Sequence, residues 1–178
     1  MIKKISSLLL VFILLVCFIT GCETKKDNTD SDSKKDTIKS VSDLSSSTGQ
    51  LHCTRNATVE GGSGDFNYYV DYNGDDITYI SSIDSVTISD SSKRKEYEDA
   101  YLKLDDYYKG IEYYYSKVDV SGDTVTHTVK INYEKIDVSK LIEIEGEEDN
   151  IYENNKAKLS KYFDLAKKNG VTCSESTS

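Results

Sequence analysis

Residues 66–79 read FNYYVDYNGDDITY, and they carry the strongest local folding signal in the chain. Large apolar side chains occupy every second position from residue 66 to residue 72, and the alternation resumes at Ile77 after Asn73 and Gly74. Alternation with a period of two is typical of a strand that buries one face, and Asn-Gly supplies the two positive-φ positions of a type I′ turn. The stretch therefore predicts a β-hairpin.

Further strands are expected on both sides of this hairpin. Residues 51–59 predict a first strand, which the glycine-rich residues 61–64 should end. We expect the strand after the Asn-Gly turn to continue to Ile88. A second hairpin is predicted from residues 111–120 and 124–133, and in 124–133 valine, histidine and isoleucine share one face while threonine, lysine and asparagine share the other.

Two helices are expected, because the apolar spacing changes to a helical period in residues 91–109 and 150–168. The stripe of the first consists of Tyr97, Tyr101, Leu104 and Tyr108. Asp90 or Ser91 is expected to cap this helix, and Gly110 to end it. Residues 134–146 fit either a short helix or a strand.

Strands that arrive as hairpins favour an antiparallel sheet, with the helices segregated to one side. We therefore predict an α+β fold with an antiparallel sheet of about five strands, made of two hairpins and a first strand, and two helices packed on one face. An antiparallel meander with both helices displaced to one end is the alternative.

The N-terminus predicts export and lipid attachment. Lys3 and Lys4 precede twelve consecutive apolar residues, 8–19, and the stretch 19–22 reads Ile-Thr-Gly-Cys. This layout indicates a secretory signal peptide, 1–21, followed by a lipidated Cys22. Twelve apolar residues fall short of the roughly 20 that an uncleaved transmembrane helix needs. We expect a lipid-anchored protein on the extracytoplasmic face of the cell membrane.

The mature chain is expected to contain one domain on a tether. Residues 22–50 are rich in Ser, Thr, Asp and Lys and cannot bury enough apolar surface to order themselves. Residues 51–173 should form a single α+β domain, and residues 174–178 a frayed tail.

Two cysteines remain after export, Cys53 and Cys173, because Cys17 leaves with the signal peptide and Cys22 is lipidated. Exported proteins sit where disulfides persist, so we expect these two to pair. The bond would close a loop of more than a hundred residues, for which chain entropy predicts about 4–5 kcal/mol of stabilisation. Two free, buried thiols are the alternative.

The acidic balance restricts the partners. Removal of residues 1–21, which hold two lysines and no acids, changes the formal net charge from −9 to −11. Such a field repels nucleic acid and anionic lipid. We expect a cationic or neutral protein or glycan partner, and no nucleic acid.

No catalytic or cofactor motif is present, and no cofactor, metal or catalytic residue is predicted. The two histidines, His52 and His127, lie far apart, and His127 falls on the buried face of its strand. The acids in residues 71–76 resemble a calcium loop only in part, because the later bidentate glutamate is missing.

Three tyrosines, Tyr69, Tyr107 and Tyr114, fall outside the positions assigned to the core. Exposed tyrosine stacks on sugars and fills protein pockets, so these residues form a possible binding surface; coverage of a second apolar layer is the alternative. We predict a non-catalytic binding or envelope-interaction module. The alternative is an extracytoplasmic, hydrolase-like enzyme with an unrecognised site.

The order of elements resembles one known family. The residues that carry the resemblance are the Ile19–Cys22 stretch, Leu51-His52-Cys53-Thr54, Tyr108-Lys109-Gly110-Ile111, Asp123-Thr124-Val125 and Lys130-Ile131-Asn132-Tyr133. Together they resemble the YehR-like family of bacterial lipoproteins. The resemblance implies a small α+β domain and supplies no functional residue.

Overall fold

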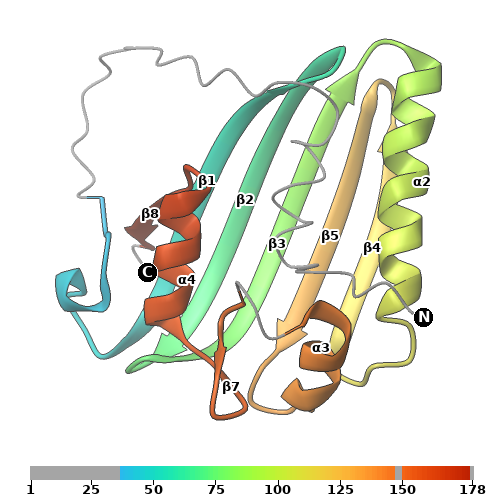
Figure 1. Ribbon diagram of the computed structural model, residues 1–178. Coiled ribbons are helices and arrows are strands. Elements are labelled where there is room, and N and C mark those ends of the chain that lie inside the picture. The colour runs from blue at the N-terminus through green and yellow to red at the C-terminus, as the bar shows by residue number, and fades with distance from the viewer. Residues whose placement is uncertain (1–36, 147–149, 177–178) are drawn as a thin grey trace.

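The computed structural model describes residues 37–146 and 150–176. Its core is a six-stranded sheet in which every neighbouring pair is antiparallel, in the spatial order β4-β5-β3-β2-β1-β8 (Figure 1). The strands are β1 (Thr48–Val59), β2 (Gly62–Asn73), β3 (Asp76–Ile88), β4 (Tyr114–Ser121), β5 (Thr124–Asn132) and β8 (Thr172–Glu175). The predicted antiparallel sheet is confirmed, with six strands where about five were expected.

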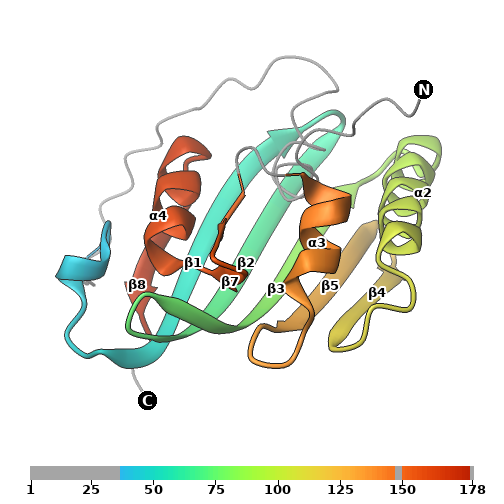
Figure 2. The same cartoon turned by 60° about the horizontal axis from the view of Figure 1, so that its bottom comes forward.

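Among the described residues, three α-helices lie on one face of the sheet, and none covers its other face (Figure 2). They are α2 (Ser91–Tyr107), α3 (Val138–Glu145) and α4 (Leu159–Lys168), accompanied by the short 3-10 helix η1 (Val41–Asp43) and the hairpin β6 (Tyr152–Glu153) and β7 (Lys156–Ala157). The α+β class with helices on one face is confirmed. The segment 134–146, which fitted a helix or a strand, contains helix α3.

The hairpin predicted from residues 66–79 is present, with a different turn. Asn73 pairs with Asp76, so the two turn residues are Gly74 and Asp75. Gly74 has a φ of +61°, while Asn73 has no positive φ and ends strand β2. The predicted type I′ turn at Asn73-Gly74 is therefore wrong by one residue, because the strand pairing extends through the asparagine.

The first strand ends at Val59, as predicted, but of the glycines at 61–64 only Gly61 lies in the turn. Val59 pairs with Gly62, so the chain turns at Glu60 and Gly61, and β2 begins immediately. A Cβ atom at Gly64 would lie 2.6 Å from the Phe66 ring, which covers this position. Glycine stands here because an aromatic ring needs the space, and not because the backbone breaks.

Helix α4 is shorter than the predicted helix at 150–168. Its first residue is Leu159, because the preceding residues form the β6–β7 hairpin. Asn154 and Asn155 both adopt positive φ, at 52° and 57°, as a tight hairpin turn requires. Asparagine tolerates this conformation better than most residues, and the two together override the helical pattern.

The two ends of the domain are joined by a disulfide. Cys53 and Cys173 stand directly opposite each other in the β1–β8 pair and are bonded, as predicted. Ile38 is buried and its backbone N–H donates to the Cys173 carbonyl over 2.9 Å.

These contacts show that the folded domain extends beyond the predicted boundaries, 51–173. Residues 37–50 were assigned to the tether and 174–176 to the tail, yet Ile38 bridges to Cys173 of β8, residues 48–50 belong to β1, and residues 174–175 pair with β1. The packing follows from the disulfide, which holds β8 beside β1 and gives Ile38 a surface to cover. The predicted signal peptide, the lipidated Cys22 and the rest of the tether lie outside the described residues.

Candidate functional site

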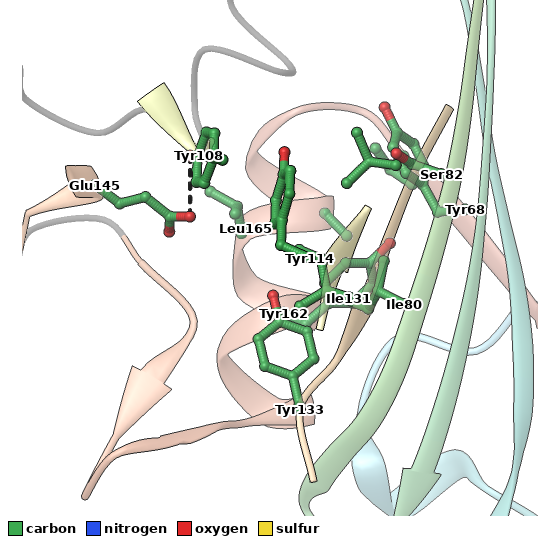
Figure 3. Close-up of a pocket in the computed structure, with 13 residues that line it drawn as sticks. Tyr68, Ile80, Ser82, Tyr108, Tyr114, Ile131, Tyr133, Glu145, Tyr162 and Leu165 are labelled. Carbon is green, nitrogen blue, oxygen red and sulfur yellow. Dashed lines mark hydrogen bonds between the residues drawn. The ribbon is translucent and has the colours of Figure 1, made fainter. Parts of the chain in front are cut away.

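A cavity of about 60 Å³ lies between the helix-covered face of the sheet and helices α3 and α4 (Figure 3). One water needs about 10–15 Å³ on this measure, so the space fits about four waters or a small organic group. Ser82, Glu145 and several aliphatic side chains line it. Five tyrosines complete the wall: Tyr68, Tyr108, Tyr114, Tyr133 and Tyr162.

The fold brings these tyrosines together from five different segments. Tyr68 of β2 and Tyr114 of β4 point inward by strand alternation, and Tyr133 follows β5 directly. Tyr108 caps the C-terminus of α2, and its ring stacks on that of Tyr114 with centroids 4.5 Å apart and planes 4° apart. Tyr162 comes from α4. The wall is therefore built by the whole domain.

Among the described residues, Glu145, the last residue of α3, is the only acid on the cavity wall. Its side chain is 1% exposed, and the Tyr108 hydroxyl donates to Oε1 over 3.1 Å. Burial raises the pKa of Glu145 from 4.5 to about 7, and the nearby Tyr152 and Tyr108 hydroxyls offset part of that rise. Within the described residues no cation pairs with this carboxyl.

Three hydroxyls on the wall have no internal partner. The Tyr68, Tyr114 and Tyr133 hydroxyls are buried and find no hydrogen-bond partner in the part of the chain that the structure describes. A buried hydroxyl without a partner costs roughly 1–3 kcal/mol. Figure 3 shows Tyr68 and Ser82 on the far side of Tyr114 from Glu145. The cavity therefore has polar groups at its two ends, and the Tyr114 hydroxyl lies between them.

A second buried acid, Asp84, lies near the cavity, at the next inward-facing position of β3 after Ser82. Arg55, Phe66, Asp84 and His127 stand opposite one another in successive strands. The Arg55 guanidinium lies 4.7 Å above the Phe66 ring centroid. Burial raises the pKa of Asp84 to about 8, although the positive charge of Arg55 opposes the rise.

His127 is held by neighbours on helix α2. Its Nε2 lies 2.7 Å from Oδ1 of Asp105, and its ring stacks on Tyr101 with centroids 4.6 Å apart. The side chain is fully buried, so the prediction that His127 is a core residue is confirmed.

The structure does not bring the three candidate tyrosines together. Tyr69 lies on the uncovered face of the sheet, where its ring stacks on His52 at 4.7 Å. Tyr107 is 41% exposed at the end of α2. Tyr114 was expected outside the core and instead lines the cavity with a buried hydroxyl, because the inward positions of β4 fall on even residue numbers.

Two functional candidates, Asp84 and Glu145, were missed by sequence reasoning. Asp84 occupies an inward position of β3, as Ser82 and Val86 do, so strand alternation alone would have found it. Glu145 lies four residues after Leu141 and seven after Val138, on the buried stripe of α3. In both cases the residue lies at a position that the strand or helix period assigns to the core, but burial was not expected for an acidic side chain.

The described residues contain neither a candidate metal site nor a candidate membrane-spanning helix. No three of their histidine, cysteine, aspartate and glutamate side chains gather closely enough to hold a metal ion. None of the helices in 37–146 and 150–176 has the length and apolarity required to span a membrane.

The fold is similar to that of a solved structure, the Escherichia coli YehR protein determined by NMR. The match has a TM-score of 0.52 and 18% sequence identity, and covers 73% of this chain and 93% of YehR. An NMR structure of a protein from Streptococcus pneumoniae TIGR4 matches with a TM-score of 0.46 and 16% identity, over 88% of this chain and 100% of that one.

No protein-family model matches the sequence. No curated protein matches it either. The structural match to YehR is thus the comparison that bears on the sequence-based resemblance, and it does so through the arrangement of strands and helices. The chain has a YehR-like α+β fold, as that resemblance implied.

Proposed function

We propose that this protein is a lipid-anchored, non-catalytic binding module on the extracytoplasmic face of the cell membrane, and that it takes a small ligand into the tyrosine-lined cavity. The observation that carries the proposal is a cavity with three buried hydroxyls that have no partner among the described residues, on Tyr68, Tyr114 and Tyr133. Ligand sites are typically concave and mainly apolar, with a few polar groups that fix the ligand's orientation. This wall has that composition.

Binding is favoured over catalysis by the arrangement of the titratable groups. General acid–base or nucleophilic catalysis needs two or more groups that converge on one reacting atom. Of the described residues that line the wall, Glu145 is the only acid, and none is a histidine, lysine or cysteine. The His127 ring pairs with the Asp105 carboxylate, and His127 lies outside the cavity wall, two residues before Val129, which lines it.

A ligand test follows from the size of the cavity. Ala166 of α4 lines the wall and is 5% exposed, so Ala166→Leu fills part of the space. Ala100→Leu makes the same change on α2, away from the cavity. Native mass spectrometry of the mature protein, purified gently from producing cells, should detect a small molecule bound to the wild type and to Ala100→Leu but not to Ala166→Leu. Failure to detect one, or its retention by Ala166→Leu, refutes the proposed site.

The anchoring part of the proposal rests on residues 19–22. Each lipid CH₂ that enters a bilayer contributes about 0.8 kcal/mol, so two or three acyl chains hold a protein firmly. Cys22→Ser should move the protein from the detergent-extracted membrane fraction to the soluble fraction, and Cys17→Ser should leave it in the membrane. Membrane association of Cys22→Ser equal to that of the wild type refutes the anchor.

A further inference from the structure

We propose that the cavity selects a small organic ammonium cation with a hydroxyl or carbonyl group, of the size and chemistry of choline. Its cationic head would lie against Glu145 and the surrounding tyrosine rings, and its polar tail against Tyr68 and Ser82. This inference rests on the proposed function of the cavity as a ligand site and names the class of ligand.

In residues 37–146 and 150–176, no positively charged group pairs with the Glu145 carboxyl. Four tyrosines face its carboxyl, Tyr108 after α2, Tyr114 of β4, Tyr133 after β5 and Tyr152 of β6. From α4, the Lys161 ammonium donates to the Tyr152 backbone carbonyl over 2.8 Å.

The other charged groups of α3 do not supply a partner either. Lys140 and Glu143 are both exposed on that helix. A buried carboxylate without a cation is unfavourable, because burial disfavours the charged form. A ligand ammonium would supply the missing charge.

Tyrosine rings are suited to the head of such a ligand. Aromatic rings carry negative charge on their faces, and several rings around one site form the cages that bind quaternary ammonium groups. Figure 3 shows Tyr108 next to Glu145, and the rings of Tyr114 and Tyr133 line the same cavity farther from it. These side chains combine an anion with aromatic walls, as recognition of an organic cation requires.

The opposite side of the cavity is suited to a neutral polar group. The Tyr68 and Ser82 side chains stand in paired positions of β2 and β3, and both are buried. The Tyr68 hydroxyl has no hydrogen-bond partner within the described residues. A ligand hydroxyl or carbonyl placed there would pair with it, which fixes the orientation of the ligand.

The charge of the whole protein favours a cation over an anion. The formal net charge is −9, and acidic proteins raise the local concentration of cations through their long-range field. An anionic ligand would meet the Glu145 carboxylate and this field together. A bare metal ion is also disfavoured, because one carboxylate supplies too few ligands for Ca²⁺ or Mg²⁺.

The test compares choline with its uncharged isostere, 3,3-dimethylbutan-1-ol, by calorimetric titration of the mature, disulfide-bonded protein. At about pH 8 we expect choline to bind the wild type at least about tenfold more tightly than the alcohol. Because the pKa of Glu145 is about 7, choline affinity should fall about tenfold between about pH 8 and about pH 6, while alcohol affinity stays constant.

Two variants locate the effect. Glu145→Gln should bind both ligands equally and lose the pH dependence. Glu143→Gln, an exposed change on the same helix, should behave as the wild type. Titration of the wild type in buffers of different ionisation enthalpy gives a measurement that needs no variant: choline should release about half a proton at about pH 7, and the alcohol none.

The outcomes separate this inference from the proposed function. Equal affinity of the wild type for the two ligands, or a retained preference in Glu145→Gln, overturns the cation inference and leaves the cavity as a binding site. Absence of choline binding also overturns it. The proposed function is decided separately, by whether Ala166→Leu loses the small molecule that co-purifies with the wild type.

Discussion

Glu145→Gln should stabilise the protein at neutral and alkaline pH, relative to wild type, and not at acid pH. The amide is neutral at every pH and has nearly the same shape as the protonated carboxyl. In the wild type the pKa of Glu145 rises from 4.5 in the unfolded chain to about 7 in the folded one. Between these values the unfolded state binds fewer protons than the folded state, so stability falls as pH rises.

The magnitude follows from the two pKa values. A rise from 4.5 to about 7, at about 1.4 kcal/mol per tenfold change, corresponds to about 3 kcal/mol. The free energy of unfolding of Glu145→Gln, minus that of the wild type, should therefore increase by about 3 kcal/mol between about pH 4 and about pH 8. Asp84, whose pKa is raised to about 8, acts in the same direction in both proteins and cancels in the difference.

The assay is urea denaturation followed by circular dichroism across this pH range, with the disulfide intact. Glu143→Gln changes an exposed glutamate of the same helix and should follow the wild type at every pH. A stability difference that is independent of pH, or one that decreases as pH rises, would show that Glu145 is not buried without a counter-charge.

Three further substitutions test the fold. Cys53→Ala should lower the free energy of unfolding by about 4–5 kcal/mol in denaturant titrations, because the disulfide to Cys173 closes a loop with a sequence separation of 120. Gly64→Ala places a Cβ atom 2.6 Å from the Phe66 ring and should cost about 1–3 kcal/mol, measured in the same way. Asp75→Ala removes an acceptor 2.7 Å from the Ser160 N–H in the first turn of α4 and should cost about 1 kcal/mol.

Each of these has a matched control. Cys17→Ala should not change the mature protein, since residue 17 precedes the predicted cleavage site. Ser63→Ala removes an exposed hydroxyl next to Gly64, and Asp106→Ala removes an exposed acid of α2; both should change stability by less than about 0.5 kcal/mol. A control as destabilising as its partner would contradict the explanation given for that partner.

The sheet was predictable where strand alternation is strong, as in β2, β3 and β5, whose buried residues follow a period close to two. Strand β4 shows why alternation of apolar residues does not predict the inward face of every strand. Six of its eight positions hold polar or exposed side chains, so its apolar pattern does not say which tyrosine faces inward. Only the register with β5, which pairs Tyr114 with buried Ile131, settles that Tyr114 enters the core.

Long-range pairing accounts for the remaining errors in the fold. Strand β8 has four residues, too few to show an alternating pattern. It forms because Cys173 pairs with Cys53 of β1 and is bonded to it. Ile38 is one apolar residue in a polar segment, and it is buried because β8 provides a surface beside it. Neither contact leaves a signal in a short window of sequence.

The candidate site was missed because acids were expected in solvent. The two buried acids differ in what surrounds them, and the difference favours Glu145 as the ligand contact. Asp84 lies within the field of Arg55, a cation that the sheet itself brings near. Glu145 has only tyrosines around it among the described residues.

A sequence that specifies its fold well satisfies its buried polar groups internally, and departures from that rule concentrate at functional sites. The row that contains Asp84 departs from the rule only in part: neither carboxylate oxygen has a hydrogen-bond partner in the described residues, but a cation of the same sheet opposes the buried charge. The cavity departs from it at four side chains: a carboxyl without a cation and three hydroxyls without partners in the described residues, Glu145, Tyr68, Tyr114 and Tyr133. One molecule with a cationic head and a polar tail would satisfy the carboxyl and a hydroxyl together, whereas water could hydrogen-bond to these groups but would supply no positive charge. The charge on Glu145 is therefore the feature that distinguishes a ligand site from a hydrated void.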